Sequence, residues 1–314
     1  MPGGDGHFRR GRRIRPGRRI ATLVRYVFAP LLVALSFLTL LPVGVREPTD
    51  AEISRSRGWY PVVGLLYGLL LVGVLKLFVL IPPPFAYTLL AAGLLTVIPA
   101  LVNRFLHLDG LMDFCDAMWG GRTVERRLEI MRDSRVGSFA VAGCFCVLLV
   151  KFAALSSLAL LIGSLAASLL VFPVISRWCM TLLLTAFPYG RQQGIGSAFF
   201  AGRRPWLATL LALLTAAGVC WLTLGVVGIS VLAASSLLAM ALGLWAARRL
   251  GGGLTGDCYG ATNEIVEAFS LACFTVWLGI EPPEYLDLGY GAGVFFHLLD
   301  WLPLQGGWFS YSAL

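Results

Sequence analysis

The chain has 314 residues, of which 58% are hydrophobic and 13% are charged. Ordinary soluble domains carry roughly 25% charged residues, and no long polar stretch could fold separately, so the composition excludes a soluble enzyme and predicts one membrane domain. The formal charge of +8 arises almost wholly in the first 25 residues, which hold eight arginines. Beside membrane helices such a tail typically binds anionic lipid, so we expect a lipid partner and no nucleic acid.

Apolar runs recur along the chain at lengths that suit a bilayer, whose core takes about 20 residues per helix. Helices are the only plausible form for them, because lipid cannot satisfy the backbone groups of open strands. Eight such runs cover residues 26–44, 59–81, 85–106, 137–160, 165–187, 205–226, 228–247 and 261–280. The predicted fold class is therefore all-α, a polytopic transmembrane helical bundle.

The loops between these runs are of two kinds. Short, uncharged loops occur at residues 81–85, 160–165 and 226–228, and longer, charged loops occur at residues 107–136, 188–204 and 248–260. Because the two kinds alternate, every charged loop falls on one face of the membrane, which the positive-inside rule makes cytoplasmic. We expect a multi-pass protein of the cell membrane whose active site faces the cytoplasm.

The first run does not fit this alternation as a full span, because the arginine tail would then lie outside the cell. Pro30 and Pro42 lie near the two ends of the run, so we predict a re-entrant or interfacial helix followed by about seven full spans. The predicted organisation is a basic cytoplasmic tail at residues 1–25, a membrane-embedded catalytic domain at 26–281 and an interfacial or outer-face extension at 282–314.

Three aspartates, Asp109, Asp113 and Asp116, follow the third run at helical spacing. Offsets of 0, 4 and 7 residues fall at about 0°, 40° and −20° around a helix, so the three carboxylates share one face. Like charges repel there, and Mg²⁺ would neutralise them, since it takes carboxylates together with substrate phosphates. We interpret the three as metal ligands; the alternative is a solvated acidic face paired with arginines.

His107 directly precedes the aspartates. Its ordinary pKa suits a general base, although an interfacial histidine bonded to the backbone is the alternative. The segment from Thr123 to Gly137 has the pattern of an amphipathic helix that ends in glycine. Guanidinium groups beside metal-binding carboxylates suit a pyrophosphate, so the candidate phosphate-binding residues are Arg132, Asp133 and Arg135. On its own, the segment is equally typical of an interfacial helix.

Two cations, Lys151 and Arg177, lie inside apolar runs. A charge at the bilayer centre costs roughly 2.5–3.5 kcal/mol, so such residues usually face the bundle interior with a partner. Either a structural ion pair or a bound phosphate would serve, but the neighbouring runs offer few carboxylates. Other polar residues could complete a cavity on the cytoplasmic side: Arg191, Arg203, Arg204, Thr255, Asp257, Glu264 and Glu267.

Two strings closely resemble the signature of the cobalamin synthase family, also called adenosylcobinamide-GDP ribazoletransferases. They are HLDGLMDFCD at residues 107–116 and RLEIMRDSRVG at residues 127–137. Further matches are LSFLTLLP at 35–42, YPVVG at 60–64, Lys151, Ser176 with Arg177, GIG at 194–196 and GLTGD at 253–257. The likeness extends over most of the predicted membrane domain.

The resemblance implies a Mg²⁺-dependent membrane transferase that joins adenosylcobinamide-GDP to α-ribazole or its 5′-phosphate and releases GMP. The aspartates would hold Mg²⁺ on the pyrophosphate, and an aspartate or His107 would take the proton of the attacking hydroxyl. The phosphate-binding cations would be Arg132, Arg135, Lys151 and Arg177.

Two other classes stay open. A CDP-alcohol phosphotransferase-like enzyme also places aspartates at a membrane surface, but its usual motif spacing is absent here. An anion or organophosphate transporter would use the buried cations, but no inverted repeat is visible. The oligomeric state is left open.

Overall fold

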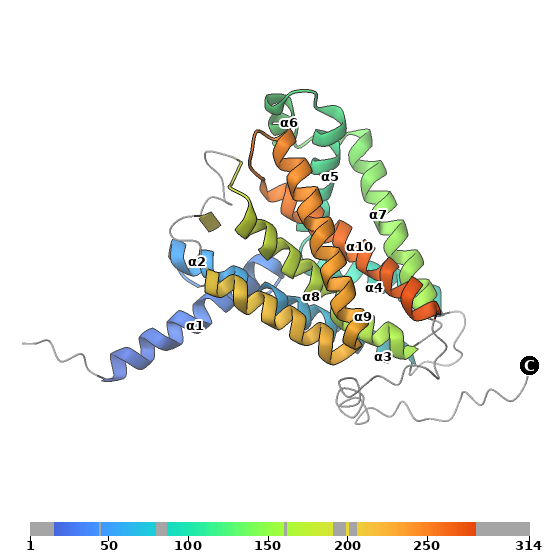
Figure 1. Ribbon diagram of the computed structural model, residues 1–314, viewed down its shortest axis with the longest axis horizontal. Coiled ribbons are helices and arrows are strands. Elements are labelled where there is room, and N and C mark those ends of the chain that lie inside the picture. Colours follow the sequence, from blue (N-terminus) through green and yellow to red (C-terminus); the bar gives the residue numbers. More distant parts are fainter. Residues whose placement is uncertain are drawn as a thin grey trace, which may run out of the picture.

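The computed structural model describes residues 16–43, 45–79, 87–159, 162–190, 199–200 and 206–280, and every regular element in them is a helix (Figure 1). In chain order these are α1 (Pro16–Leu38), α2 (Asp50–Ser56), the single turn η1 (Arg57–Trp59), α3 (Tyr60–Val79), α4 (Tyr87–Val102), α5 (Leu106–Gly120), α6 (Val124–Ile130), α7 (Ser138–Leu158), α8 (Ile162–Ala186), α9 (Trp206–Arg249) and α10 (Gly256–Ile280). The all-α prediction is confirmed. Most of the predicted tail and the whole extension at 282–314 lie outside the described residues.

Several helices are long and apolar enough to cross a membrane. Four qualify in the described part of the chain, covering Asp50–Phe78, Ser138–Leu158, Gly163–Ala186 and Trp206–Arg249, and α4 with α5 gives a fifth if that bent pair counts as one span. A multi-pass protein is therefore supported, but the predicted number of about seven spans is not confirmed. The apolar part of α1, Arg25–Leu38, is shorter than these spans, and its re-entrant or interfacial placement stays a prediction.

The long helix α9 consists of two arms that meet at Gly225. A straight helix of 44 residues would extend about 66 Å, roughly twice the hydrocarbon thickness of a bilayer. Gly225 has φ 53° and ψ −130°, a backbone conformation that residues other than glycine rarely adopt. The two arms diverge sharply from this bend in Figure 1. They correspond to the separate runs predicted at residues 205–226 and 228–247.

The central helix of the bundle is α8, whose apolar stretch is 83% buried. It packs against α3, α9 and α10. Glycines on α3 allow the closest of these contacts: a Cβ built at Gly68 would lie 2.7 Å from the Cα atom of Leu170. Large apolar side chains on the outside of the bundle, such as Leu77 and Leu237, are exposed, as lipid-facing residues should be.

The segment predicted as one amphipathic helix is shorter than expected, and this part of the prediction is wrong. Helix α6 begins after Thr123, whose hydroxyl accepts a hydrogen bond from the N–H of Arg126 at 3.2 Å, and it ends at Ile130. Beyond the helix, the side chain of Asp133 accepts a hydrogen bond from the backbone N–H of Arg135 at 3.1 Å. Such a local bond between side chain and backbone competes with the helical pattern, so the chain turns instead of continuing the helix.

One end of the molecule gathers the charged segments. Figure 1 shows α6 there with the end of α5, the start of α7 and the end of α9. Arg127 donates to the carbonyl of Arg249 at 3.1 Å, which joins α6 to the end of α9. Gly190 donates to the carbonyl of Leu254 at 2.8 Å, which joins the end of α8 to the start of α10. The candidate site is built at this end.

Candidate active site

Helix α5 carries the three predicted aspartates on one side, since Leu106–Gly120 is helical throughout. Asp109 is exposed, and Asp113 and Asp116 are half-buried. A bend of 90° separates α5 from the apolar α4. Arg104 and Phe105 form this bend with left-handed conformations, at φ 57° and 60°. The shared helical face is thus confirmed, while the metal role of its carboxylates stays a prediction.

Helix α10 packs against α5 through two glycines. A Cβ built at Gly110 would lie 3.1 Å from the Cα atom of Asp257, and one built at Gly260 would lie 3.1 Å from the carbonyl oxygen of His107. This close approach brings Asp257, in the first turn of α10, beside the helix that carries the aspartates. Thr255 donates its hydroxyl hydrogen to Asp257 at 3.2 Å. The structure therefore places Asp257 beside α5, although the two are far apart in the sequence.

Replacing Gly110 by alanine is expected to lower the free energy of unfolding by about 1–3 kcal/mol. The new methyl group would meet the backbone of Asp257, at 3.1 Å and 3.2 Å, and backbone atoms cannot move as a side chain can. Thermal unfolding of the purified protein in detergent measures the effect. Gly73→Ala is the matched control, because a Cβ there meets nothing within 4 Å; equal midpoints for the two variants would contradict the close packing.

Asp116 differs from the other two aspartates. Its Oδ2 accepts the backbone N–H of Gly137 at 2.6 Å, and its Oδ1 accepts that of Ala140 at 2.9 Å. Both carboxylate oxygens are therefore bonded to the N-terminal end of α7, one at the N-cap and one in the first turn. The metal role predicted for Asp116 has no direct support in this geometry.

The arginine-bearing segment lies at the same end of the molecule. Arg132 is exposed, and Asp133 forms an ion pair with Arg135 at 2.7 Å. This hydrogen-bonded partner lowers the pKa of Asp133 from its usual value to about 2. A surface depression of about 490 Å³ is lined by Glu125, Leu128, Glu129, Arg132 and Asp133. Asp133 is therefore the partner of the Arg135 guanidinium, and phosphate binding by Arg132, Asp133 and Arg135 stays a prediction.

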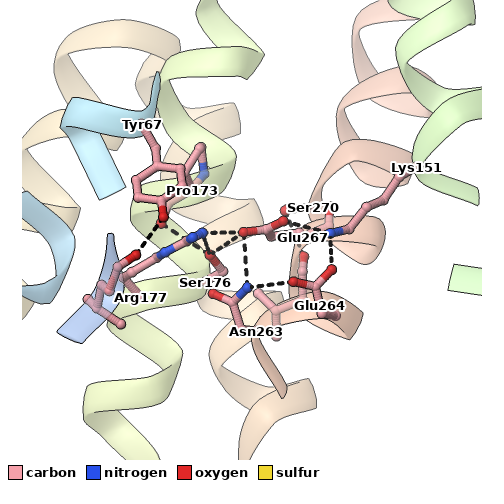
Figure 2. Close-up of polar contacts among 11 residues, drawn as sticks. Tyr67, Lys151, Pro173, Ser176, Arg177, Asn263, Glu264, Glu267 and Ser270 are labelled. Atoms are coloured by element: carbon pink, nitrogen blue, oxygen red, sulfur yellow. Dashed lines mark hydrogen bonds and ion pairs between the residues drawn. The ribbon is translucent and has the colours of Figure 1, made fainter. Parts of the chain in front are cut away.

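Lys151 and Arg177 belong to a buried charge network, shown in Figure 2. Lys151 donates to Glu264 at 2.5 Å and to Glu267 at 2.6 Å, and Arg177 forms an ion pair with Glu267. The side chain of Asn263 donates to both glutamates, at 3.2 and 3.1 Å. Lys151 is 4% exposed and Arg177 is 0% exposed. Two cations and two carboxylates thus neutralise each other between α7, α8 and α10.

The expectation that few carboxylates would be available to Lys151 and Arg177 is therefore wrong, because α10 supplies two. Glu264 and Glu267 are three residues apart in the sequence, and that spacing places them on one face of a helix. Which helices that face would meet depends on packing, and the sequence contained no signal for it. Binding of phosphate by the two cations stays a prediction, and their partners in the structure are carboxylates. Asn263 was not foreseen as a member of this network.

His107 lies on the buried side of α5. It is 2% exposed, and it is placed about 160° around the helix from Asp109. Its Nε2 has no hydrogen-bond partner among the described residues. Because it faces α10 rather than the open face of the aspartates, its predicted role as a general base lacks a geometry that would support it.

The donor chemistry at the α5–α10 contact fits a magnesium ion. No group of three or more His, Cys, Asp or Glu side chains in the described part of the chain could hold a metal by itself. Mg²⁺ does not need such a cage, because it takes one or two carboxylates and completes its shell with water and substrate phosphates. Asp113 and Asp257 are half-buried carboxylates on either side of this contact, and their hard oxygens are the ligands that the ion prefers.

Comparisons with known proteins agree with the motifs. The family model described as cobalamin-5-phosphate synthase matches residues 30–275. An adenosylcobinamide-GDP ribazoletransferase of Desulfitobacterium hafniense is 38% identical over 249 residues, which cover 77% of this chain and 94% of the relative. The protein of that name from Pseudomonas putida KT2440 is 42% identical over 241 residues, covering 76% and 95%. No solved structure shows a significant match.

The matched region includes all of α5, α6, α7 and α8, and it contains every residue of the candidate site. The resemblance seen in the sequence, and the enzyme class that it implied, are confirmed. The chain therefore belongs to the cobalamin-5-phosphate synthase family and is a transferase of cobalamin biosynthesis.

Proposed function

We propose that the protein joins adenosylcobinamide-GDP to α-ribazole, or to its 5′-phosphate, and releases GMP in a Mg²⁺-dependent reaction. The relatives that carry the name adenosylcobinamide-GDP ribazoletransferase support the two substrates. In this reaction a ribazole hydroxyl attacks the phosphorus nearer the corrinoid. One P–O bond forms there, the P–O bond to GMP breaks, and the hydroxyl proton passes to a base.

The observation that carries the proposal is the position of Asp257 beside the acidic face of α5, at the end of the molecule that also holds the arginines. Side chains on a helix point toward its N-terminus. Asp257 lies in the first turn of α10 and contacts Gly110 through its main chain, so its side chain extends toward the level of Asp113, one turn further along α5. Asp113 and Asp257 would then form a carboxylate pair contributed by two helices.

We assign roles on this basis. Asp113 and Asp257 would hold Mg²⁺, which when bound neutralises charge on the pyrophosphate. Arg132 and Arg135 would bind phosphate oxygens, for which guanidinium groups have matching geometry. Asp109 is the exposed carboxylate of the same face. We assign to it the role of the base that accepts the proton of the attacking hydroxyl.

Two further elements belong to the proposal. The positive-inside rule supports a cytoplasmic position for the end of the molecule that carries these groups. The arginine-rich residues before Tyr26 would hold that face against anionic lipid. Lys151 and Arg177 would act on the site indirectly, by fixing α7 and α8 to α10.

A direct assay tests the proposal. Purified protein in detergent or liposomes, supplied with adenosylcobinamide-GDP and α-ribazole, is expected to release GMP and form the joined corrinoid only when Mg²⁺ is present. Chromatography resolves both products, and EDTA followed by Mg²⁺ should stop and then restore the reaction. GMP release that does not require ribazole, or turnover that is unaffected by EDTA, would contradict the proposal.

A further inference from the structure

The carboxylate of Asp116 occupies the place of a helix cap. Helix α7 begins after Gly137, an N-cap with φ −94° and ψ 176° and no side chain of its own to accept a hydrogen bond. The first N–H groups of a helix have no partner inside it. In a capping box, the N-cap and N3 residues satisfy each other's backbone N–H through their own side chains. Asp116 bonds the same two groups, those of Gly137 and Ala140, from a different helix.

We propose that Asp116 is a positioning residue, which caps α7 from α5 and thereby holds the arginine-bearing loop over the site, and that it is not a ligand of Mg²⁺. The bond to Gly137 closes the loop of residues 121–136 onto α5, the helix that it follows. That loop carries Arg132 and Arg135. The proposal rests on the function proposed above for those arginines, and it separates Asp116 from Asp113 on the same face.

The absence of a side chain at residue 137 supports this assignment. A Cβ built there would lie 2.6 Å from Oδ1 and 2.8 Å from Oδ2 of Asp116, which is closer than atoms of these kinds approach. The carboxylate and a side chain at the N-cap therefore exclude each other. Within the same loop, α6 is capped in the ordinary way by the hydroxyl of its own N-cap, Thr123.

This exclusion suggests a rescue experiment. Asp116→Ala should raise the KM for adenosylcobinamide-GDP about tenfold, as expected when a capping bond that positions the loop is lost, with the KM for ribazole and the Mg²⁺ concentration for half-maximal activity unchanged. The double variant Asp116→Ala with Gly137→Ser should recover most of this loss, because the space left by the carboxylate admits a serine whose hydroxyl can cap Ala140. Gly137→Ser alone should be impaired, since Asp116 still fills that space.

Thermal unfolding of the same variants gives a readout that does not depend on activity. Its midpoint should fall in Asp116→Ala and recover in the double variant, even if the protein uses other substrates, so a failure of the proposed function remains distinguishable from a failure of this inference. If Asp116→Ala does not accumulate, Asp116→Asn replaces it as a single variant only, because its amide keeps the volume that excludes a side chain at residue 137; with one acceptor oxygen left, its losses of midpoint and of KM should be partial, and a full midpoint with a higher Mg²⁺ requirement would contradict the capping role. A higher Mg²⁺ requirement in the single variant, with no recovery of midpoint or KM in the double variant, would overturn the proposal.

Discussion

Replacing Lys151 by methionine is expected to destabilise the protein severely, by about 3–5 kcal/mol. The substitution leaves Glu264 and Glu267, which are 3% and 1% exposed, with Arg177 as the one remaining cation of the network. An uncompensated charge in a membrane-embedded core has neither water nor a counter-ion. The yield of monodisperse protein and the midpoint of thermal unfolding in detergent should both fall.

A second substitution should reverse much of this loss. Lys151→Met with Glu264→Gln removes one charge of each sign and leaves the ion pair of Arg177 with Glu267 intact. Lys151→Met with Glu267→Gln has the same net charge but removes the carboxylate that Arg177 contacts, so it is the matched control and should recover much less. The difference between the two double variants reports which carboxylate each cation needs.

The alternative for Lys151 is that it binds a phosphate of the substrate. In that case Lys151→Met would accumulate to the yield of the unmodified protein and have the same unfolding midpoint. The weaker binding of substrate would appear as a higher KM. Neither double variant would then restore anything, because neither returns a cation to the site. That pattern would remove the structural role assigned to the network and would return Lys151 to the phosphate-binding set.

The course of the helices could be predicted from the sequence because apolar length and helical period are local properties. The runs predicted at residues 59–81 and 137–160 are found as α3 and α7, and the break between the two runs near residue 227 is found as the bend at Gly225. The shared face of the aspartates follows from the period of a helix alone. Boundaries were less accurate where a side chain competes with the helix, as Asp133 does after α6.

The partners of individual side chains could not be predicted in the same way. Asp113 and Asp116 are equivalent in the pattern of the sequence, yet the second is bonded to the N-terminus of α7. The period of a helix gives the direction of each side chain but not the helix that lies in that direction. Long-range packing of the helices also places Asp257 beside Gly110. It likewise decides which carboxylates contact Lys151. Roles within the site thus required the arrangement of α5, α7 and α10.

Replacing either carboxylate of the proposed magnesium pair is expected to reduce turnover by roughly a hundredfold or more, since each supplies charge to the ion that neutralises the pyrophosphate. Asp113→Asn and Asp257→Asn should accumulate in membranes as folded protein, and both should need more Mg²⁺ for half-maximal activity. Asp50→Asn is a matched control, because Asp50 is an exposed carboxylate of α2, outside the site.

The combination of the two substitutions tests whether the carboxylates act on one ion. Residues that act as a unit show strongly non-additive losses, so the double variant should be scarcely less active than either single variant. Turnover is measured at saturating substrate across a Mg²⁺ series. Losses that multiply, or a Mg²⁺ requirement that only Asp113→Asn changes, would place Asp257 outside the metal site. The contact through Gly110 would then be one of packing alone, and the ion would depend on α5 without help from α10.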